Sequence, residues 1–347
     1  MHTKNFNLKH TLESGQFFRY YTKNSWYYIT FKEYFFRARQ ENDDLTIDGV
    51  PERIAKQFFG LEQDYDNILA TFEDPLLKTI IKQLIGLRLL QQDPWECMCA
   101  FICSSASNIP KITKNVNLLA QNFGKHLTFE NEESYSFPRP GELTDNQKIL
   151  TTGVGFRAKF LININKTVSE QQINLLKTNN YHQTIEYLTS LNGIGEKIAD
   201  CVALFSLQKF QAFPVDVWIQ RIMEQHYTGS AKKQQIKIPT ALEGQGITDN
   251  DIGIFNVANT IRQNTNCKPD RGKVTGYSQQ IKNSSQGKPL ELFKPGIESF
   301  TNHGKPHSMH SIREIKNFAQ IYFGKYAGYA QQFLYHWGRM EAKKSKI

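Results

Sequence analysis

Residues 191–201 (LNGIGEKIADC) constrain the fold more than any other part of the chain, because two glycines interrupt a helical pattern. Apolar residues recur at helical spacing before Leu191 and after Glu196, which predicts two helices joined by a tight hairpin. Gly193 and Gly195 permit a left-handed backbone and the close approach of a second backbone. The free amides of the second helix point into the turn and favour an anion such as a phosphate. An ordinary helical hairpin without a ligand is the alternative.

Lys197 and Asp216 are the candidate catalytic residues beside this hairpin. We expect Lys197 one turn into the second helix, where partial burial and the helix N-terminus favour a neutral amine that can form a Schiff base. Asp216 follows Pro214 and precedes a helical pattern, so we expect an N-cap whose backbone N–H groups keep the carboxylate ionised. Such a carboxylate can stabilise positive charge on a sugar ring. The alternatives are a lysine that reaches solvent and an aspartate that only caps its helix.

Composition narrows the classes of protein. The net charge of +9 over 347 residues is compatible with a polyanionic partner. No apolar run approaches the roughly 20 residues that span a bilayer, and the N-terminus lacks the apolar core of a signal peptide. We therefore expect a cytoplasmic protein, associated with the nucleoid if bacterial, that binds no membrane. The five cysteines lack the spacing of zinc or iron–sulfur sites, so we predict no metal and no cofactor.

The periodicity predicts an α+β protein. Residues 11–50 have the pattern of strands and turns, including a strand over 15–20, and the periodicity is helical from 51 to about 228. The predicted parts are an N-terminal antiparallel sheet domain with the first linking helices (1–75), a helical core with the hairpin (76–228), a loosely ordered insertion (229–311) and C-terminal helices (312–347). Within the polar insertion only residues 251–263 have a helical pattern. We favour a neutral insertion over one that contacts DNA or a protein.

Five further blocks of sequence accompany the hairpin. Together with the hairpin, lysine and aspartate, they are similar to the helix-hairpin-helix DNA glycosylases, and within that superfamily to the 8-oxoguanine DNA glycosylase/lyases. The blocks are residues 15–20 (GQFFRY), 92–96 (QDPWE), 101–111 (FICSSASNIPK), 153–159 (GVGFRAK) and 326–332 (YAGYAQQ).

The resemblance implies roles for individual residues. Lys197 resembles the nucleophile that attacks the sugar C1′ and forms a Schiff base, and Asp216 resembles the essential carboxylate. Gly15 resembles the glycine whose carbonyl accepts the N7–H of 8-oxoguanine, where guanine would present a second acceptor. Gln331 resembles the residue that reads the Watson–Crick edge. Cys201 and Tyr335 correspond to the residues on either side of the flipped base.

The resemblance also implies a DNA-binding face. Phe156 resembles the aromatic wedge that replaces the flipped base, and Arg157 the residue that contacts the opposite cytosine. The remaining residues implied to contact DNA are Asn108, Lys111, Gly193 and Gly195. For all these residues to act together, the segment at Gly15 and the helix bearing Gln331 must converge on the Lys197 helix.

Three residues depart from the family pattern. Ala106 stands where an asparagine usually fills the gap in the duplex and bonds the estranged base. Lys111 replaces an arginine, and a lysine cannot make the same planar bidentate contact. Trp218 replaces a histidine near the phosphate of the lesion. These departures predict that the enzyme still removes the damaged base but distinguishes less strictly between the bases that can lie opposite it.

The function that the resemblance implies is base-excision repair. The enzyme would act as a monomer on damaged duplex DNA, remove 8-oxoguanine and cleave the abasic site by β-elimination. The alternatives are a glycosylase of this superfamily for another damaged base, and a non-catalytic DNA-binding module whose pocket the insertion disables.

Overall fold

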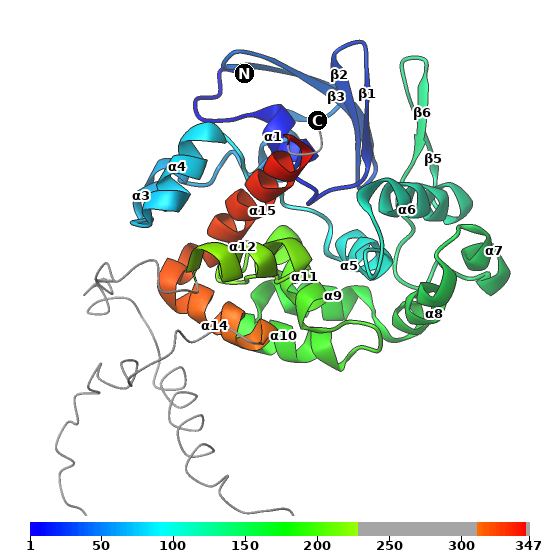
Figure 1. Ribbon diagram of the computed structural model, residues 1–347. Helices are drawn as coiled ribbons and strands as arrows, with labels where there is room; N and C mark the ends of the chain where they lie inside the picture. The colour runs from blue at the N-terminus through cyan, green and yellow to red at the C-terminus, as the bar shows by residue number, and fades with distance from the viewer. Residues whose placement is uncertain (228–310, 345–347) are drawn as a thin grey trace, which may run out of the picture. The chain divides into compact units, whose positions relative to one another are not determined.

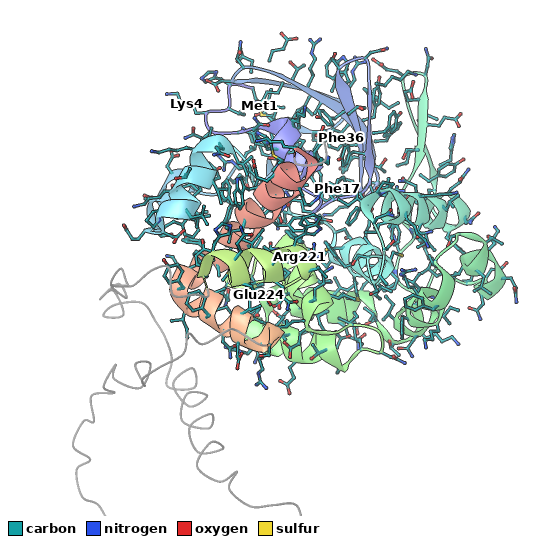
Figure 2. The ribbon with its side chains drawn as sticks, in the orientation of Figure 1. Met1, Lys4, Phe17, Phe36, Arg221 and Glu224 are labelled. Atoms are coloured by element: carbon teal, nitrogen blue, oxygen red, sulfur yellow. The ribbon has the colours of Figure 1, made fainter. Side chains whose placement is uncertain are left out.

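A four-stranded antiparallel sheet, in which sequence neighbours pair, forms the N-terminal part of the fold (Figure 1). The computed structural model describes residues 1–227 and 311–344. Ile29 pairs with Phe36, and both side chains are fully buried in a core that also holds Phe17 (Figure 2). The predicted sheet is therefore present. Its strands are β1 (Tyr20–Lys23), β2 (Trp26–Phe31), β3 (Tyr34–Glu41) and β4 (Asp44–Asp48).

The segment before β1 differs from the prediction. Helix α1 (Leu8–Glu13) includes the first residues of the region predicted to form strands, 11–50, and residues 15–19 form no strand. Gly15 has a φ of +82°, which breaks an extended run. The buried amide of Gln16 donates to the carbonyl oxygens of Thr11 and Arg88 and accepts from the N–H of Leu90, so side-chain bonds hold this segment in place.

Helices dominate the rest of the described chain, as predicted. Asp74 and Asp93 cap two of them, each followed by a proline at the first helical position. The helices before the hairpin are α2 (Glu52–Phe58), α3 (Tyr65–Ala70), α4 (Pro75–Gln83), α5 (Pro94–Cys103), α6 (Ile109–Phe123), α7 (Asn146–Thr151), α8 (Ala158–Thr167), α9 (Glu170–Thr178) and α10 (Tyr181–Ser190). Those that follow it are α11 (Glu196–Leu207), α12 (Val217–Tyr227), α14 (Ile312–Phe323) and α15 (Ala327–Lys344).

The prediction of continuous helix from 51 to 228 is wrong in one place. A two-stranded hairpin, β5 (His126–Phe129) and β6 (Glu132–Tyr135), follows α6. Glu130 adopts a φ of +53° in its turn. The ring of Phe129 packs edge-on against Phe35 of β3, at 6.4 Å between centroids, and Arg37 of β3 forms an ion pair with Glu130. The contacts that stabilise this hairpin therefore come from the N-terminal sheet, which periodicity along one segment cannot reveal.

Helix α11 is the centre of the second core, with residues 198–207 all buried. Helix α15 docks closely against it, because a Cβ on Gly328 would lie 2.2 Å from Leu204 Cδ1 and 2.8 Å from the carbonyl oxygen of Ala212. The Gly328 N–H also donates to the carbonyl oxygen of Phe210 at 2.7 Å. Helix α15 packs on α12 and α4 as well (Figure 1). This close docking positions Gln331 and the residues that follow it.

Several predictions fall outside the described residues. They are the insertion over 229–311, apart from Ser311, which caps α14, and the helix over 251–263. The four-part division of the chain into domains stays a prediction. Within residues 1–227 and 311–344, no helix is long and apolar enough to cross a membrane.

Candidate active site

The glycine hairpin forms the predicted tight turn between α10 and α11. The N–H of Ile194 donates to the carbonyl oxygen of Leu191 at 3.1 Å. Gly193 has a φ of +97°, and a Cβ there would lie 2.4 Å from the Phe160 ring, so both its conformation and its packing require glycine. Gly195 differs from the expectation. It is the extended N-cap of α11, with φ −88° and open space around its Cα.

Lys197 is the second residue of α11, closer to the helix start than we predicted. Its half-buried side chain points towards the end of α5. There Nζ donates to Ser104 Oγ at 3.1 Å and lies 5.3 Å from the centroid of the Phe101 ring. The amine is therefore held between two helices rather than extended into solvent.

Asp216 caps α12, as its position after Pro214 predicts. Its Oδ1 accepts the N–H of Ile219 at 2.9 Å. Burial raises the pKa of this carboxyl, whereas the Ile219 N–H and the charges of Lys197 and Arg339 lower it. The sequence predicts that the backbone N–H groups dominate the ionisation of this carboxyl. Desolvation is instead the largest influence, because the side chain is mostly enclosed.

Residues from distant parts of the chain meet at this point. A Cβ on Gly15 would lie 3.3 Å from Tyr335 Cε1, so the segment after α1 touches α15. Burial raises the pKa of the Cys201 thiol to about 12, and the charges of Lys197 and Asp216 both act on that thiol. Burial also raises the pKa of Tyr335 to about 12, with Asp216 and Cys201 contributing. The predicted convergence of Gly15, α11 and α15 is present.

Gln331 lies in the wall of the same site. Its side chain is 4% exposed, and Nε2 donates to the carbonyl oxygen of Pro214 at 3.2 Å. Its Oε1 is buried without a hydrogen-bond partner among the described residues. An unpaired buried acceptor is costly, so this amide is suited to accept from the N–H groups of a bound base.

The side chains expected to enter the duplex differ in exposure. Phe156 is 57% exposed, which suits a wedge. Arg157 is 3% exposed, and its guanidinium donates to the backbone carbonyl oxygens of Val154, Ser105 and Ala106. A contact between Arg157 and an opposite cytosine would have to replace these bonds, so that role stays a prediction.

The remaining predicted DNA contacts lie on the surface. Asn108 caps α6 by accepting the N–H of Lys111 at 3.0 Å, and the Lys111 side chain is exposed. Ala106 is exposed with a φ of +47°, a left-handed conformation that asparagine adopts more readily than alanine. Trp218 is half-buried and follows Asp216 by two residues. The guanidinium of Arg221, which is labelled in Figure 2, lies 5.8 Å from the centroid of its ring.

Comparison with known proteins adds independent findings. Residues 1–98 match the family model of the 8-oxoguanine DNA glycosylase N-terminal domain. A Saccharomyces cerevisiae "N-glycosylase/DNA lyase" is 39% identical over 168 residues, which are 44% of this chain and 45% of that protein. A Methanothermobacter thermautotrophicus "Probable N-glycosylase/DNA lyase" is 30% identical over 207 residues, 52% of this chain and 66% of the relative. The chain thus spans less than two thirds of the length of either relative.

The fold comparison covers nearly the whole chain. The MBOgg1 protein, solved with a low-affinity DNA ligand, is 28% identical with a TM-score of 0.70, covering 98% of this chain and 94% of its own. The Clostridium acetobutylicum 8-oxoguanine glycosylase/lyase, solved with duplex DNA, shares the fold with a TM-score of 0.71 at 24% identity, covering 97% of this chain and 93% of its own. Residues 1–98 therefore match the N-terminal domain of the 8-oxoguanine DNA glycosylases, and the described fold is similar to that of solved proteins of this kind.

Two residues of this candidate site are not indicated by the motifs in the sequence. Ser104 contacts the Lys197 amine from α5, and no local pattern around Ser104 indicates that contact. Arg339 follows Gln331 and Tyr335 at intervals of four residues on α15. Residues at this spacing share one helix face, so the pattern could have revealed it.

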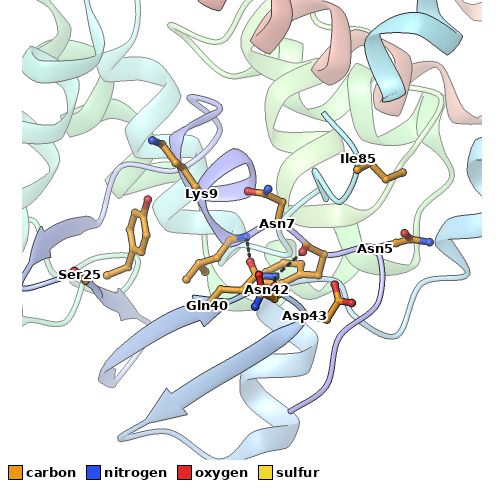
Figure 3. A pocket seen from close by; sticks show the side chains of 11 residues that line it. Asn5, Asn7, Lys9, Ser25, Gln40, Asn42, Asp43 and Ile85 are labelled. Carbon is orange, nitrogen blue, oxygen red and sulfur yellow. Dashed lines mark hydrogen bonds between the residues drawn. The ribbon is translucent and has the colours of Figure 1, made fainter. Parts of the chain in front are cut away.

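A cavity of about 550 Å³ lies elsewhere, beside the N-terminal sheet (Figure 3). Its lining includes Asn5, Lys9 and Asp43 and none of the predicted site residues. The amide of Gln40 in its wall is occupied, because it accepts from the Leu8 N–H and donates to two backbone carbonyl oxygens. In the described part of the chain, no group of three or more His, Cys, Asp and Glu side chains is arranged to hold a metal.

Proposed function

We propose that this protein removes 8-oxoguanine from duplex DNA and cleaves the resulting abasic site. The observation that carries the proposal is the meeting of an amine, a carboxyl group and an unpaired buried amide oxygen in one site, from Lys197, Asp216 and Gln331. The family model of the N-terminal domain supports this substrate, and the name of the yeast relative supports the two activities.

In the proposed reaction the neutral amine of Lys197 attacks the sugar C1′. The N-glycosidic bond breaks, and the base leaves with its bonding electron pair. The ionised carboxylate of Asp216 stabilises the positive charge that grows on the sugar as this bond breaks. Loss of a proton from the nitrogen and opening of the sugar ring give a Schiff base. Removal of a C2′ proton then expels the 3′ phosphate by β-elimination.

The pocket is proposed to select the base through complementary hydrogen bonds. The Gly15 carbonyl would accept N7–H, and Gln331 Oε1 would accept from the Watson–Crick edge. Cys201 and Tyr335 would lie on the two faces of the flipped base. Both are protonated near neutrality, because burial raises the pKa of each to about 12.

On the DNA side, Phe156 is proposed as the wedge, with Gly193 and Gly195 at a phosphate. Asn108, Lys111 and Arg157 are proposed to lie along the duplex. Ala106 offers no hydrogen-bonding side chain to the opposite base, so we propose excision that depends weakly on that base. The proposed place of action is the cytoplasm, with association with the nucleoid if the protein is bacterial.

A nicking assay tests the function and its alternatives. Duplexes carrying 8-oxoguanine opposite each of the four bases should all be cut at the lesion, at similar rates. Duplexes with other damaged bases are tested beside them. Cutting at another damaged base without cutting at 8-oxoguanine would contradict the proposed substrate. Binding of all duplexes without any cleavage would favour the non-catalytic alternative. Strong preference for cytosine would contradict the proposed relaxation.

A further inference from the structure

Arg339 is a half-buried cation that the proposed reaction does not use. Its Nη1 is buried without a hydrogen-bond partner among the described residues. A Cβ built on Gly15 would lie 2.7 Å from this Nη1 and 3.3 Å from Tyr335 Cε1. The guanidinium carbon lies 5.3 Å from the centroid of the Tyr335 ring. Arg339 is therefore placed against both Gly15 and the ring proposed to cover the flipped base.

Charged and titratable groups surround this guanidinium. Its charge lowers the pKa of the Asp216 carboxyl, and its charge and a side-chain hydrogen bond lower that of Tyr335, against burial, which raises both. Tyr20 and His336 also lie within its electrostatic influence. Nη1 remains the buried donor of this guanidinium without a partner in the described part of the chain, which is costly, so the site favours a ligand with an acceptor oxygen next to Gly15.

We propose that Nη1 of Arg339 donates a hydrogen bond to O8 of the flipped base. This inference rests on the proposed function and on the proposed contact between the Gly15 carbonyl and N7–H. 8-Oxoguanine differs from guanine at two adjacent atoms, where it has N7–H and C8=O instead of an N7 acceptor and C8–H. An acceptor from Gly15 beside a donor from Arg339 matches both changes. Guanine would leave Nη1 unpaired.

Burial favours the base over a DNA phosphate as the ligand. Backbone phosphates of a duplex stay at the protein surface, whereas Nη1 is enclosed. Gln331 provides the unpaired acceptor that suits the Watson–Crick edge. A donor near Gly15 instead faces the edge that carries N7 and its neighbouring carbonyl oxygens. Of these, O8 is the oxygen found only in the damaged base.

The first test compares two substrates of one enzyme. Arg339→Leu should release 8-oxoguanine roughly 10- to 100-fold more slowly in single turnover, as expected for loss of a hydrogen bond to a charged group. Borohydride trapping on a duplex that already contains an abasic site should stay close to the wild-type rate, because no base is present. Arg53→Leu, at an exposed arginine of α2, is the matched control and should change neither rate. Equal losses on both substrates, or no loss on 8-oxoguanine, would overturn the proposal.

The second test separates the hydrogen bond from the charge. Arg339→Lys keeps a cation near Asp216 but loses the planar donor, and it should stay impaired on 8-oxoguanine. Full activity of this variant would show that charge alone matters and would overturn the proposal.

The third test uses binding in a Lys197→Gln background. Adding Arg339→Leu should lower affinity for 8-oxoguanine duplexes more than for guanine duplexes. Equal losses would point to O6, which both bases carry, and would contradict the contact with O8. A wild-type protein that neither excises nor traps would instead refute the proposed function itself.

Discussion

The Lys197 amine donates to the Ser104 hydroxyl across 3.1 Å, from the first turn of α11 to the end of α5. The Ser104 hydroxyl in turn donates to the carbonyl oxygen of Phe101 at 2.6 Å. Because a hydroxyl has one proton, Ser104 can only accept from the lysine in this arrangement. The bond fixes the direction of the amine before any DNA is bound.

Ser104→Ala should therefore slow formation of the Schiff base. Loss of the hydrogen bond that orients the amine predicts roughly a tenfold lower rate of borohydride trapping on abasic DNA, which corresponds to about 1.4 kcal/mol. Ser190→Ala is the matched control, since that hydroxyl also donates to the carbonyl three residues earlier at a helix end. Trapping that is unchanged in Ser104→Ala would mean that Lys197 is oriented by other contacts.

Local parts of this site could be predicted from sequence, and contacts across the chain could not. The cap at Asp216 and the turn at Gly193 follow from neighbouring residues and are present. The proximity of Gly15 to Tyr335 could be predicted only from the resemblance to a known family, because no local sequence pattern indicates it. The contact of Ser104 with Lys197 depends on how α5 docks against α11, so no local pattern predicts it, whereas the spacing of Arg339 from Gln331 and Tyr335 on α15 could have indicated their shared face. The roles of Ser104 and Arg339, like those of the predicted site residues, stay predictions.

Asp216→Asn should lower excision by roughly 10²–10⁴-fold, because the carboxylate is the proposed stabiliser of charge on the sugar. Asparagine is also a good N-cap, so α12 should remain capped. Loss of excision below fivefold in a correctly folded variant would argue against the role, with about fivefold being roughly 1 kcal/mol.

The same variant should show a pH-dependent gain in stability. Burial raises the pKa of Asp216, so the folded state favours the protonated form. The stabilisation from this raised pKa is fully present at a pH below the pKa of the carboxyl in the unfolded chain, near 3.9. It is lost as the pH rises through the higher pKa of the carboxyl in the folded protein. Asp216→Asn should therefore melt at or above the wild-type temperature at pH 7, with a smaller difference at pH 4. A lower melting temperature at pH 7 would contradict this reasoning.

Ala106→Gly should stabilise the protein by about 0.5–1 kcal/mol. Alanine at a φ of +47° costs roughly 1–2 kcal/mol, which exceeds the extra entropy that glycine loses on folding. Urea unfolding measures the difference. Ala100→Gly, inside helix α5, is the opposite control and should destabilise by about 1 kcal/mol or more. Destabilisation by Ala106→Gly would show that no strain is stored there.

His336 should make the fold sensitive to acid. Burial lowers its pKa to about 3, with His10, Arg339 and Lys343 adding to the effect. A depressed histidine pKa leaves stability complete above the unfolded value, near 6.5, and reduces it as pH falls towards 3, by up to about 1.4 kcal/mol per pH unit. His336→Phe should flatten the dependence of unfolding free energy on pH between 6 and 4, as read from urea titrations. His182→Gln, at an exposed histidine, is the control and should leave the dependence of unfolding free energy on pH as in the wild type. Equal dependence on pH in the wild type, His336→Phe and His182→Gln would exclude His336 as its source.

Borohydride trapping tests the central claim most directly, because it captures the covalent bond between the enzyme and the sugar. Wild-type protein mixed with an 8-oxoguanine duplex and borohydride should give a stable protein–DNA adduct. Lys197→Gln should give none while still binding the duplex, since glutamine has no nucleophilic amine. An adduct formed by Lys197→Gln at the wild-type yield would contradict the assignment of the nucleophile.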